Sequence, residues 1–203
     1  MIKDREEVGR IRKACRIASR VADEIPEMLS KGMKEYEAAA ELDYRMMKMG
    51  ASGAAFGTNA SFGASSAEPH HGAEDIALRE GDTALFDFGC KVEGYCSDIT
   101  RTFFLGEPED WQRRMYQVVA EAQRAALGTI RAGANGRDVD AAARAVIDAS
   151  EFKGLMVHST GHGLGLSVHA WLHRKDHPRP QGDGPYGGAR RVRPREGRGT
   201  DRG

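Results

Sequence analysis

Two aspartates in neighbouring segments are the residues of this chain with the clearest chemistry. Asp87 lies in DFG (87–89), Asp98 lies in SDITRT (97–102), and His162 follows in GHGLG (161–165). Two carboxylates on one face of a sheet repel each other unless a positive charge neutralises them. A divalent cation does this, and a pair of cations about 3.5–4 Å apart can also activate a water between them. An imidazole would add a neutral nitrogen ligand.

The segments that carry the two aspartates predict a β-hairpin. Residues 83–89 and 95–105 read as strands, and Glu93-Gly94 suits a tight turn between them. Asp87 lies opposite Asp98 if the hairpin pairs about residues 92 and 93, and opposite Thr100 if it pairs about 93 and 94. Both registers place the aspartates on one face, because side chains alternate with a period of two.

A simpler interpretation of the same aspartates stays open at this point. DFG is short enough to occur by chance. Aspartates of a hairpin can also form ordinary salt bridges, here with Lys91 or Arg101.

Helical periodicity surrounds this hairpin and predicts an α+β fold. Apolar residues recur at helical spacing over 4–25, 35–49, 109–131 and 136–149. Pro26 is expected to weaken or kink the end of the first helix. Residues 51–68 are rich in Gly, Ala and Ser and are expected to form a loop.

Composition excludes several classes of protein. The 203 residues suffice for one domain, and 30 Lys and Arg balance 30 Asp and Glu, so overall charge favours neither nucleic-acid nor membrane binding. Three cysteines (Cys15, Cys90, Cys96) form no disulfide framework. The charged N-terminus lacks an apolar signal core, and no apolar run approaches a membrane span. We therefore expect a soluble, cytoplasmic protein.

The C-terminal segment differs in character from the rest. Residues 173–203 contain nine Lys and Arg against four Asp and Glu, together with many Gly and Pro. Such a segment cannot bury enough apolar surface to offset its ordering entropy, so we expect a domain over 1–172 and a disordered basic tail over 173–203. An Arg/Gly-rich tail can bind RNA through charge and stacking, but Tyr186 is its only aromatic residue, which disfavours nucleic acid as a partner.

Four motifs in order give the chain a family resemblance. They are PHH (69–71), DFG (87–89), EGYCSDITRT (93–102) and HSTGHGLGLSVH (158–169). The set resembles the pita-bread metallopeptidases, specifically their aminopeptidase P and prolidase branch, from residue 1 to about 169. The resemblance implies an incomplete pita-bread (creatinase/aminopeptidase-like) fold, with an antiparallel sheet covered by helices.

The resemblance also implies a metal site and a reaction. Asp87 matches a bidentate ligand, Asp98 a bridging ligand and His162 the histidine ligand of two divalent ions, which would be Mn, Co or Zn. The reaction implied is metal-assisted removal of the N-terminal residue from peptides with proline in second position. A peptide substrate and a homodimer are the partners that this resemblance suggests.

Three more residues receive roles from the resemblance. His70 matches a histidine that contacts substrate near the scissile carbonyl, with His71 as the alternative if the loop is aligned one residue off. His169 matches a second histidine that is not a ligand and steadies the tetrahedral intermediate. Arg101 is either an outer partner of an aspartate ligand or part of a surface salt bridge.

The pattern departs from the family after His169. The family supplies two later glutamate ligands, one of them a general base, but Ala170 stands where a glutamate commonly follows. Glu196 is the only glutamate after residue 151, and it lies in an Arg/Gly/Pro tract without a strand pattern. We therefore expect a truncated copy with impaired metal binding and catalysis, its tail produced by a frameshift near residues 170–173. The alternative is an inactive pita-bread module that binds peptide or protein partners.

Overall fold

The first helix begins at a capping box and continues past the position where we expected it to weaken. The computed structural model describes residues 2–169, so the tail expected over 173–203 lies outside the described part. Helix α1 spans Arg5–Met28, and at its start Asp4 and Glu7 each accept the other's backbone N–H. Pro26 lies inside α1, and the bond from Leu29 N to Ile25 O (3.1 Å) closes the last turn. Pro26 therefore does not end the helix.

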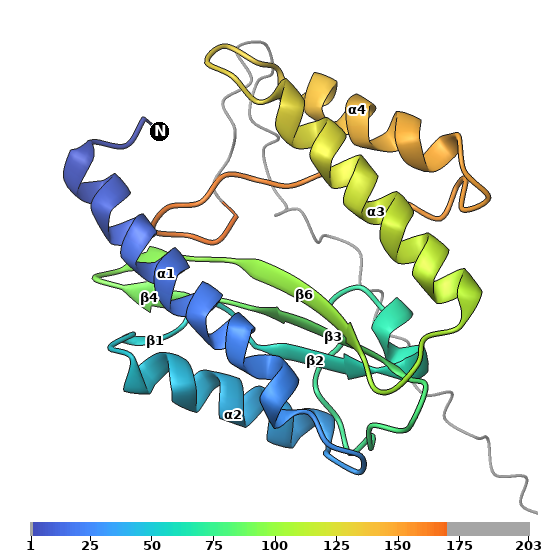
Figure 1. The fold of residues 1–203 in the computed structure, drawn as a ribbon. Coiled ribbons are helices and arrows are strands. Elements are labelled where there is room, and N and C mark those ends of the chain that lie inside the picture. The colour runs from blue at the N-terminus through green and yellow to red at the C-terminus, as the bar shows by residue number, and fades with distance from the viewer. Residues whose placement is uncertain (1, 170–203) are drawn as a thin grey trace, which may run out of the picture. The chain divides into compact units, whose positions relative to one another are not determined.

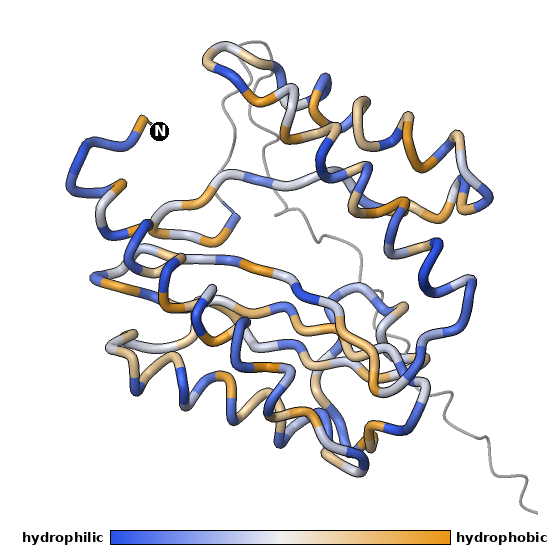
Figure 2. Tube along the Cα trace, in the orientation of Figure 1, coloured by the Kyte–Doolittle hydropathy of each residue, from blue (hydrophilic) through white to orange (hydrophobic). Residues whose placement is uncertain are grey.

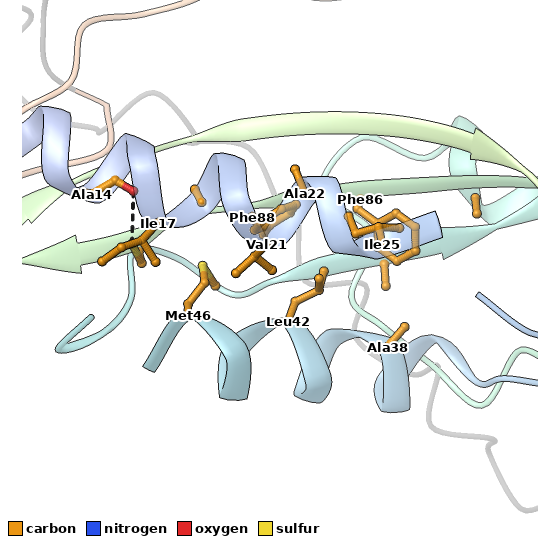
Figure 3. Packing of buried hydrophobic residues seen from close by; sticks show 14 of the residues in the cluster. Ala14, Ile17, Val21, Ala22, Ile25, Ala38, Leu42, Met46, Phe86 and Phe88 are labelled. Carbon is orange, nitrogen blue, oxygen red and sulfur yellow. Dashed lines mark hydrogen bonds between the residues drawn. The ribbon is translucent and has the colours of Figure 1, made fainter. Parts of the chain in front are cut away.

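Helix α2 packs beside α1 through a narrower apolar stripe than the sequence indicated. It spans Glu35–Lys48, and Gly50 (φ 96°) follows it in the left-handed conformation that favours glycine. Among the apolar residues of the predicted helix over 35–49, Leu42 and Met46 are buried, whereas Tyr36 is 49 % exposed. Figure 3 shows the buried side chains of the two helices meeting those of the central strands.

Two three-stranded antiparallel sheets carry the candidate site. One has the order β2-β3-β6, with β2 Asn59–Phe62, β3 Thr83–Phe88 and β6 Ile99–Phe104. The other has the order β1-β4-β5, with β1 Gly53–Ala54, β4 Cys90–Val92 and β5 Tyr95–Cys96.

The expectation of a loop over 51–68 was wrong. This stretch contains β1, β2 and a 3-10 helix at Gly63–Ala67. All four residues of β2 are buried, so the strand lacks the alternating polarity by which a strand is recognised in a sequence. Its pairing with β3 sets its conformation, as Asn59 lies opposite Asp87.

The turn at Glu93-Gly94 fixes the register of the hairpin. Glu93 (φ 50°) and Gly94 (φ 83°) both adopt positive φ, as the central residues of a type I′ turn do, and Val92 pairs with Tyr95 across them. The hairpin therefore pairs about residues 93 and 94, and Asp87 lies opposite Thr100. This is the second of the two registers that the sequence allowed.

The core lies between the central strands and the first two helices. Phe86 is fully buried and makes edge-to-face contacts with Phe62 (6.0 Å between ring centroids) and Phe103 (6.2 Å). Val21 and Ile25 of α1 belong to the same cluster. Figure 2 shows apolar residues recurring along these strands and helices, with polar residues between them.

The last two helices form a pair of their own. Helix α3 spans Asp110–Thr129 and α4 spans Gly136–Asp148, as predicted, and they pack around Ala122, Ala126 and Ala143. Figure 1 shows α3 and α4 side by side. Three apolar residues of the predicted helix over 109–131 are more than half exposed: Val119, Leu127 and Ile130. Among the helices of residues 2–169, none is long and apolar enough to cross a bilayer.

Candidate metal centre

The two aspartates meet where the long hairpin bends. Asp87 is the penultimate residue of β3, and its Oδ1 accepts a hydrogen bond from Thr100 Oγ1 (2.9 Å) on β6. Asp98 directly precedes β6. Asp98 therefore lies next to the strand pair that carries Asp87, and the two side chains are near enough to interact electrostatically.

The close approach of the chain at Gly89 explains the position of Asp98. A Cβ at Gly89 would lie 2.0 Å from Ser97 O and 3.2 Å from Asp98 Cα, so only glycine fits. The adjacent Ser97 is buried, and its Oγ accepts the backbone N–H of Cys90 (3.0 Å). Ser97 N donates in turn to Cys90 O (2.9 Å). These contacts hold the backbone on both sides of the carboxylate pair.

The electrostatics of the pair favour a cation. Burial first, and the negative charge of Asp87 second, raise the pKa of Asp98 above its usual range. The positive charges that His162 and His169 can carry act in the opposite direction. The raised pKa means that the protein around Asp98 does not compensate its negative charge, as expected for a carboxylate that binds a metal.

The segment over residues 162–169 brings two imidazoles, those of His162 and His169, near Asp98. His162 Nε2 lies 3.2 Å from Asp98 Oδ2, and the rings of His162 and His169 are 4.3 Å apart between centroids. Of the three residues that the sequence placed together, the structure puts His162 against Asp98 and Asp98 near Asp87.

The donor types suit a divalent cation, although the donors are not arranged as a coordination sphere. Two carboxylates and one imidazole are ligands that Mn, Co and Zn accept. Asp98 and His162, however, contact each other directly. Within residues 2–169, no group of three or more His, Cys, Asp or Glu side chains is placed to hold a metal ion.

The two histidines of PHH have different surroundings. His71 is 6 % exposed at its side chain, and its Nε2 lies 2.8 Å from Oε2 of the fully buried Glu35. The bond to Glu35 raises the pKa of His71 against the effect of burial. His70 is exposed and adopts φ 60°, an uncommon conformation for a residue other than glycine.

Glu35 is a residue that the sequence reasoning missed. It begins α2, where an acidic residue is ordinary, so nothing in the sequence distinguishes it from an exposed one. Its carboxylate accepts four hydrogen bonds, from Phe62 N, Ser65 Oγ, His71 Nε2 and Glu74 N. Burial would raise the pKa of Glu35, but the hydrogen bonds outweigh burial and lower it.

Arg101 lies apart from the aspartates. It follows Thr100 on β6, so its side chain leaves the strand on the opposite face from Thr100 and Asp87. Its guanidinium donates to Thr100 O (2.9 Å) and is exposed. Within residues 2–169, neither Arg101 nor Lys91 forms an ion pair with Asp87 or Asp98, so the expected partner of an aspartate is not seen there.

Comparisons with known proteins identify the family of the chain. Residues 9–193 match the model of metallopeptidase family M24. An Xaa-Pro dipeptidase of Pyrococcus furiosus is 38% identical over 171 residues, which are 84% of this chain and 49% of the relative. A probable dipeptidase PepE of Mycobacterium tuberculosis is 41% identical over 170 residues, 83% of this chain and 45% of the relative.

Solved structures give the same answer for the fold. A prolidase from Pyrococcus furiosus superposes with a TM-score of 0.82 at 38% identity, covering 84% of this chain and 51% of that chain. An X-Pro aminopeptidase from Thermotoga maritima gives 0.80 at 41% identity, covering 83% and 48%. The expected α+β pita-bread fold is confirmed, and this chain spans about half the length of the relatives it matches.

Proposed function

Because the chain belongs to metallopeptidase family M24, we propose that it carries the activity of an Xaa-Pro peptidase. The substrate would be a peptide with proline in second position, and the product its free N-terminal residue. The names of the matched relatives, Xaa-Pro dipeptidase and X-Pro aminopeptidase, support this substrate class. The proposal also includes a homodimer, on the resemblance alone, and a cytoplasmic location, on the composition of the sequence.

The observation that carries the proposal is the pair of neighbouring carboxylates, Asp87 and Asp98, with the imidazole of His162 3.2 Å from Asp98. Asp87, Asp98 and His162 would hold divalent metal, with Thr100 orienting Asp87 through its hydroxyl. Bound divalent ions supply a water activated for attack and an electrophile for the scissile carbonyl. The metal identity is left open among Mn, Co and Zn.

The histidines outside the ligand set would act on the substrate. His169, whose ring lies 4.3 Å from that of His162 between centroids, would donate to the oxyanion formed from the scissile carbonyl. His70 is the better candidate for the substrate contact than His71, because His71 is buried on Glu35 whereas His70 is exposed. Arg101 has no part in this proposal.

We also propose that the rate of peptide hydrolysis is reduced. Ala170 follows His169 where the family commonly has a glutamate, and Glu196 lies outside the described residues. The second candidate function is a pita-bread module that binds peptide without cleaving it. It is favoured by one observation: no group of three potential ligands within residues 2–169 is placed to hold a metal.

The test compares hydrolysis of a peptide with binding of the same peptide. The full chain is incubated with Mn²⁺ or Co²⁺ and a peptide carrying proline in second position, and release of the first residue is measured. A peptide with alanine in place of proline is the substrate control. Asp87→Asn and Asp98→Asn are the site variants, and Asp23→Asn, an exposed residue of α1, is the matched control.

Three results are decisive. Proline-dependent release that both site variants abolish and Asp23→Asn retains supports the peptidase. Peptide binding without release by the wild-type chain supports the binding module. A chain that neither cleaves nor binds the peptide refutes both functions.

A further inference from the structure

Two residues of α4 hold the segment that leads to His162. Arg144 donates from Nη1 to Met156 O (3.0 Å) and from Nη2 to His158 O (3.1 Å). Asp140, one turn earlier, accepts the backbone N–H of Thr160 at Oδ1 (2.7 Å). The two side chains also pair with each other, with Arg144 Nε 3.3 Å from Asp140 Oδ2.

These contacts differ from those of an ordinary pair on a solvated helix face. The side chains of Arg144 and Asp140 are 37% and 26% exposed, and both are joined to main-chain atoms of another segment. Residues 155–157 lie outside any helix or strand, and Met156 O receives its hydrogen bond from a side chain, that of Arg144. The Thr160 N–H is also the largest cause of the lowered pKa of Asp140.

A second anchor follows His162. Cys96 N on β5 donates to Gly165 O (2.8 Å), and Cys96 Sγ lies 3.7 Å from Leu166 O. His162 therefore lies between a contact with α4 at Thr160 and a contact with the sheet at Gly165. Gly161 (φ 71°) provides the turn between them. The imidazole spans from this short segment to Asp98.

We propose that Asp140 and Arg144 are positioning residues for the His162 imidazole. The contacts of Cys96 join the segment that contains His162 to the hairpin that carries Asp98. The hydrogen bonds of Asp140 and Arg144 join the same segment to the helix pair α3 and α4. Removing the α4 contacts would leave His162 anchored at one end only, free to rotate away from Asp98. The consequence for metal affinity rests on the proposed function, because it requires His162 to be a ligand.

The experiment uses the full chain and variants that differ in one anchor. Asp140→Ala and Arg144→Ala remove the contacts, and Asp140→Asn keeps an acceptor for the Thr160 N–H. Arg114→Ala is the matched control, since Arg114 forms an exposed pair with Glu151 (2.7 Å), just after α4, and touches none of residues 156–162. Circular dichroism checks that each variant is folded.

Three quantities are measured. Hydrogen exchange of the Thr160 amide is expected to rise about tenfold in Asp140→Ala. The ring ¹⁵N resonances of His162 are expected to shift in both alanine variants, which a general loss of stability would not cause. Mn²⁺ affinity, measured by titration calorimetry, is expected to fall about 10–100-fold. Asp140→Asn should recover much of each effect, and Arg114→Ala should match wild type.

The outcomes separate this inference from the proposed function. Unchanged His162 resonances in both alanine variants overturn the inference, even if Thr160 exchanges faster, because the pair then serves stability alone. A wild-type chain that does not bind Mn²⁺ refutes the metal site, while exchange and ring resonances still decide the positioning role. If an alanine variant fails to fold, Arg144→Met decides, because it keeps the length of the side chain but has no donor for Met156 O and His158 O; an unchanged His162 signal there overturns the inference.

Discussion

Replacing Glu35 by alanine should be among the most destabilising single changes in this chain. The substitution removes the acceptor of four donors at once. Phe62 N and Ser65 Oγ keep partners in their own turn, because Phe62 N also donates to Ser65 Oγ (2.9 Å) and Ser65 Oγ also contacts Phe62 O. His71 Nε2 and Glu74 N lose the contact that they have with Glu35.

The magnitude follows from these two losses. Each unsatisfied buried donor costs about 1–3 kcal/mol, and removing one partner of a buried ion pair costs about 3–5 kcal/mol. Glu74 is exposed, so water can replace the partner of its N–H, and the loss of the His71 pair dominates; we therefore expect the free energy of unfolding to fall by about 3–5 kcal/mol in Glu35→Ala. Glu35→Gln keeps the shape and one acceptor oxygen, so a smaller loss is expected.

The stabilisation should also depend on pH with a defined sign. The pKa of His71 is raised above 6.5, so its contribution is complete below pH 6.5 and is lost as pH rises through the raised pKa. The pKa of Glu35 is lowered below 4.5, so its contribution is complete above pH 4.5 and is lost as pH falls. Glu68, 3.5 Å from His71 Nδ1, acts in the same sense as Glu35 on His71. The difference between wild type and Glu35→Gln should be largest between pH 4.5 and 6.5.

Urea denaturation at pH 5.5 and pH 9 tests this. Glu37→Ala is the matched control, since Glu37 lies in the same turn of α2, is exposed and accepts only the Lys34 N–H in the described structure (2.8 Å). A loss in Glu35→Ala no larger than in Glu37→Ala would refute the reasoning. A Glu35→Gln difference that does not shrink at pH 9 would refute the ion pair.

Three further substitutions test the site and the core. Gly89→Ala should destabilise the chain by about 1–3 kcal/mol or more, because its Cβ would meet Ser97 O at 2.0 Å, and an unchanged urea midpoint would contradict the close approach. Asp98→Asn should abolish Mn²⁺ binding, as titration calorimetry would measure. The metal-free variant should be as stable as wild type or more stable at pH 7, because burial and Asp87 oppose the charge of Asp98. A marked loss of metal-free stability in urea denaturation would contradict the electrostatics. Phe86→Ala should cost about 3–5 kcal/mol, because Phe86 is fully buried between two aromatic rings; a loss below about 1 kcal/mol in urea denaturation would contradict the core packing.

The hairpin and the helices could be predicted because local signals determine them. Alternation set the strands around Asp87 and Asp98, and the Glu93-Gly94 turn allowed two registers, of which the structure has the one that pairs Asp87 with Thr100. Helical periodicity located all four helices to within about three residues. The end of α1 was missed because its buried face extends beyond Pro26 to Met28, which packs against the core.

The remaining features depend on contacts distant in sequence. Strand β2 is buried on both faces, so its residues carry no alternation, and only its place beside β3 makes it a strand. Glu35 is buried and accepts several hydrogen bonds because residues 62–74 fold over it. No local sequence pattern reveals this contact. Arg101 looked like a partner of an aspartate by proximity in sequence, but the period of the strand turns it to the other face.

The central claim is that Asp87, Asp98 and His162 bind divalent metal together, and anomalous X-ray scattering tests it directly. Crystals of the chain soaked in Mn²⁺ would be measured near the manganese absorption edge. If the three residues bind the metal, an anomalous peak is expected within about 2.0–2.3 Å of a carboxylate oxygen of each aspartate and of His162 Nε2. A peak elsewhere, or none at a concentration that saturates binding in solution, would contradict it.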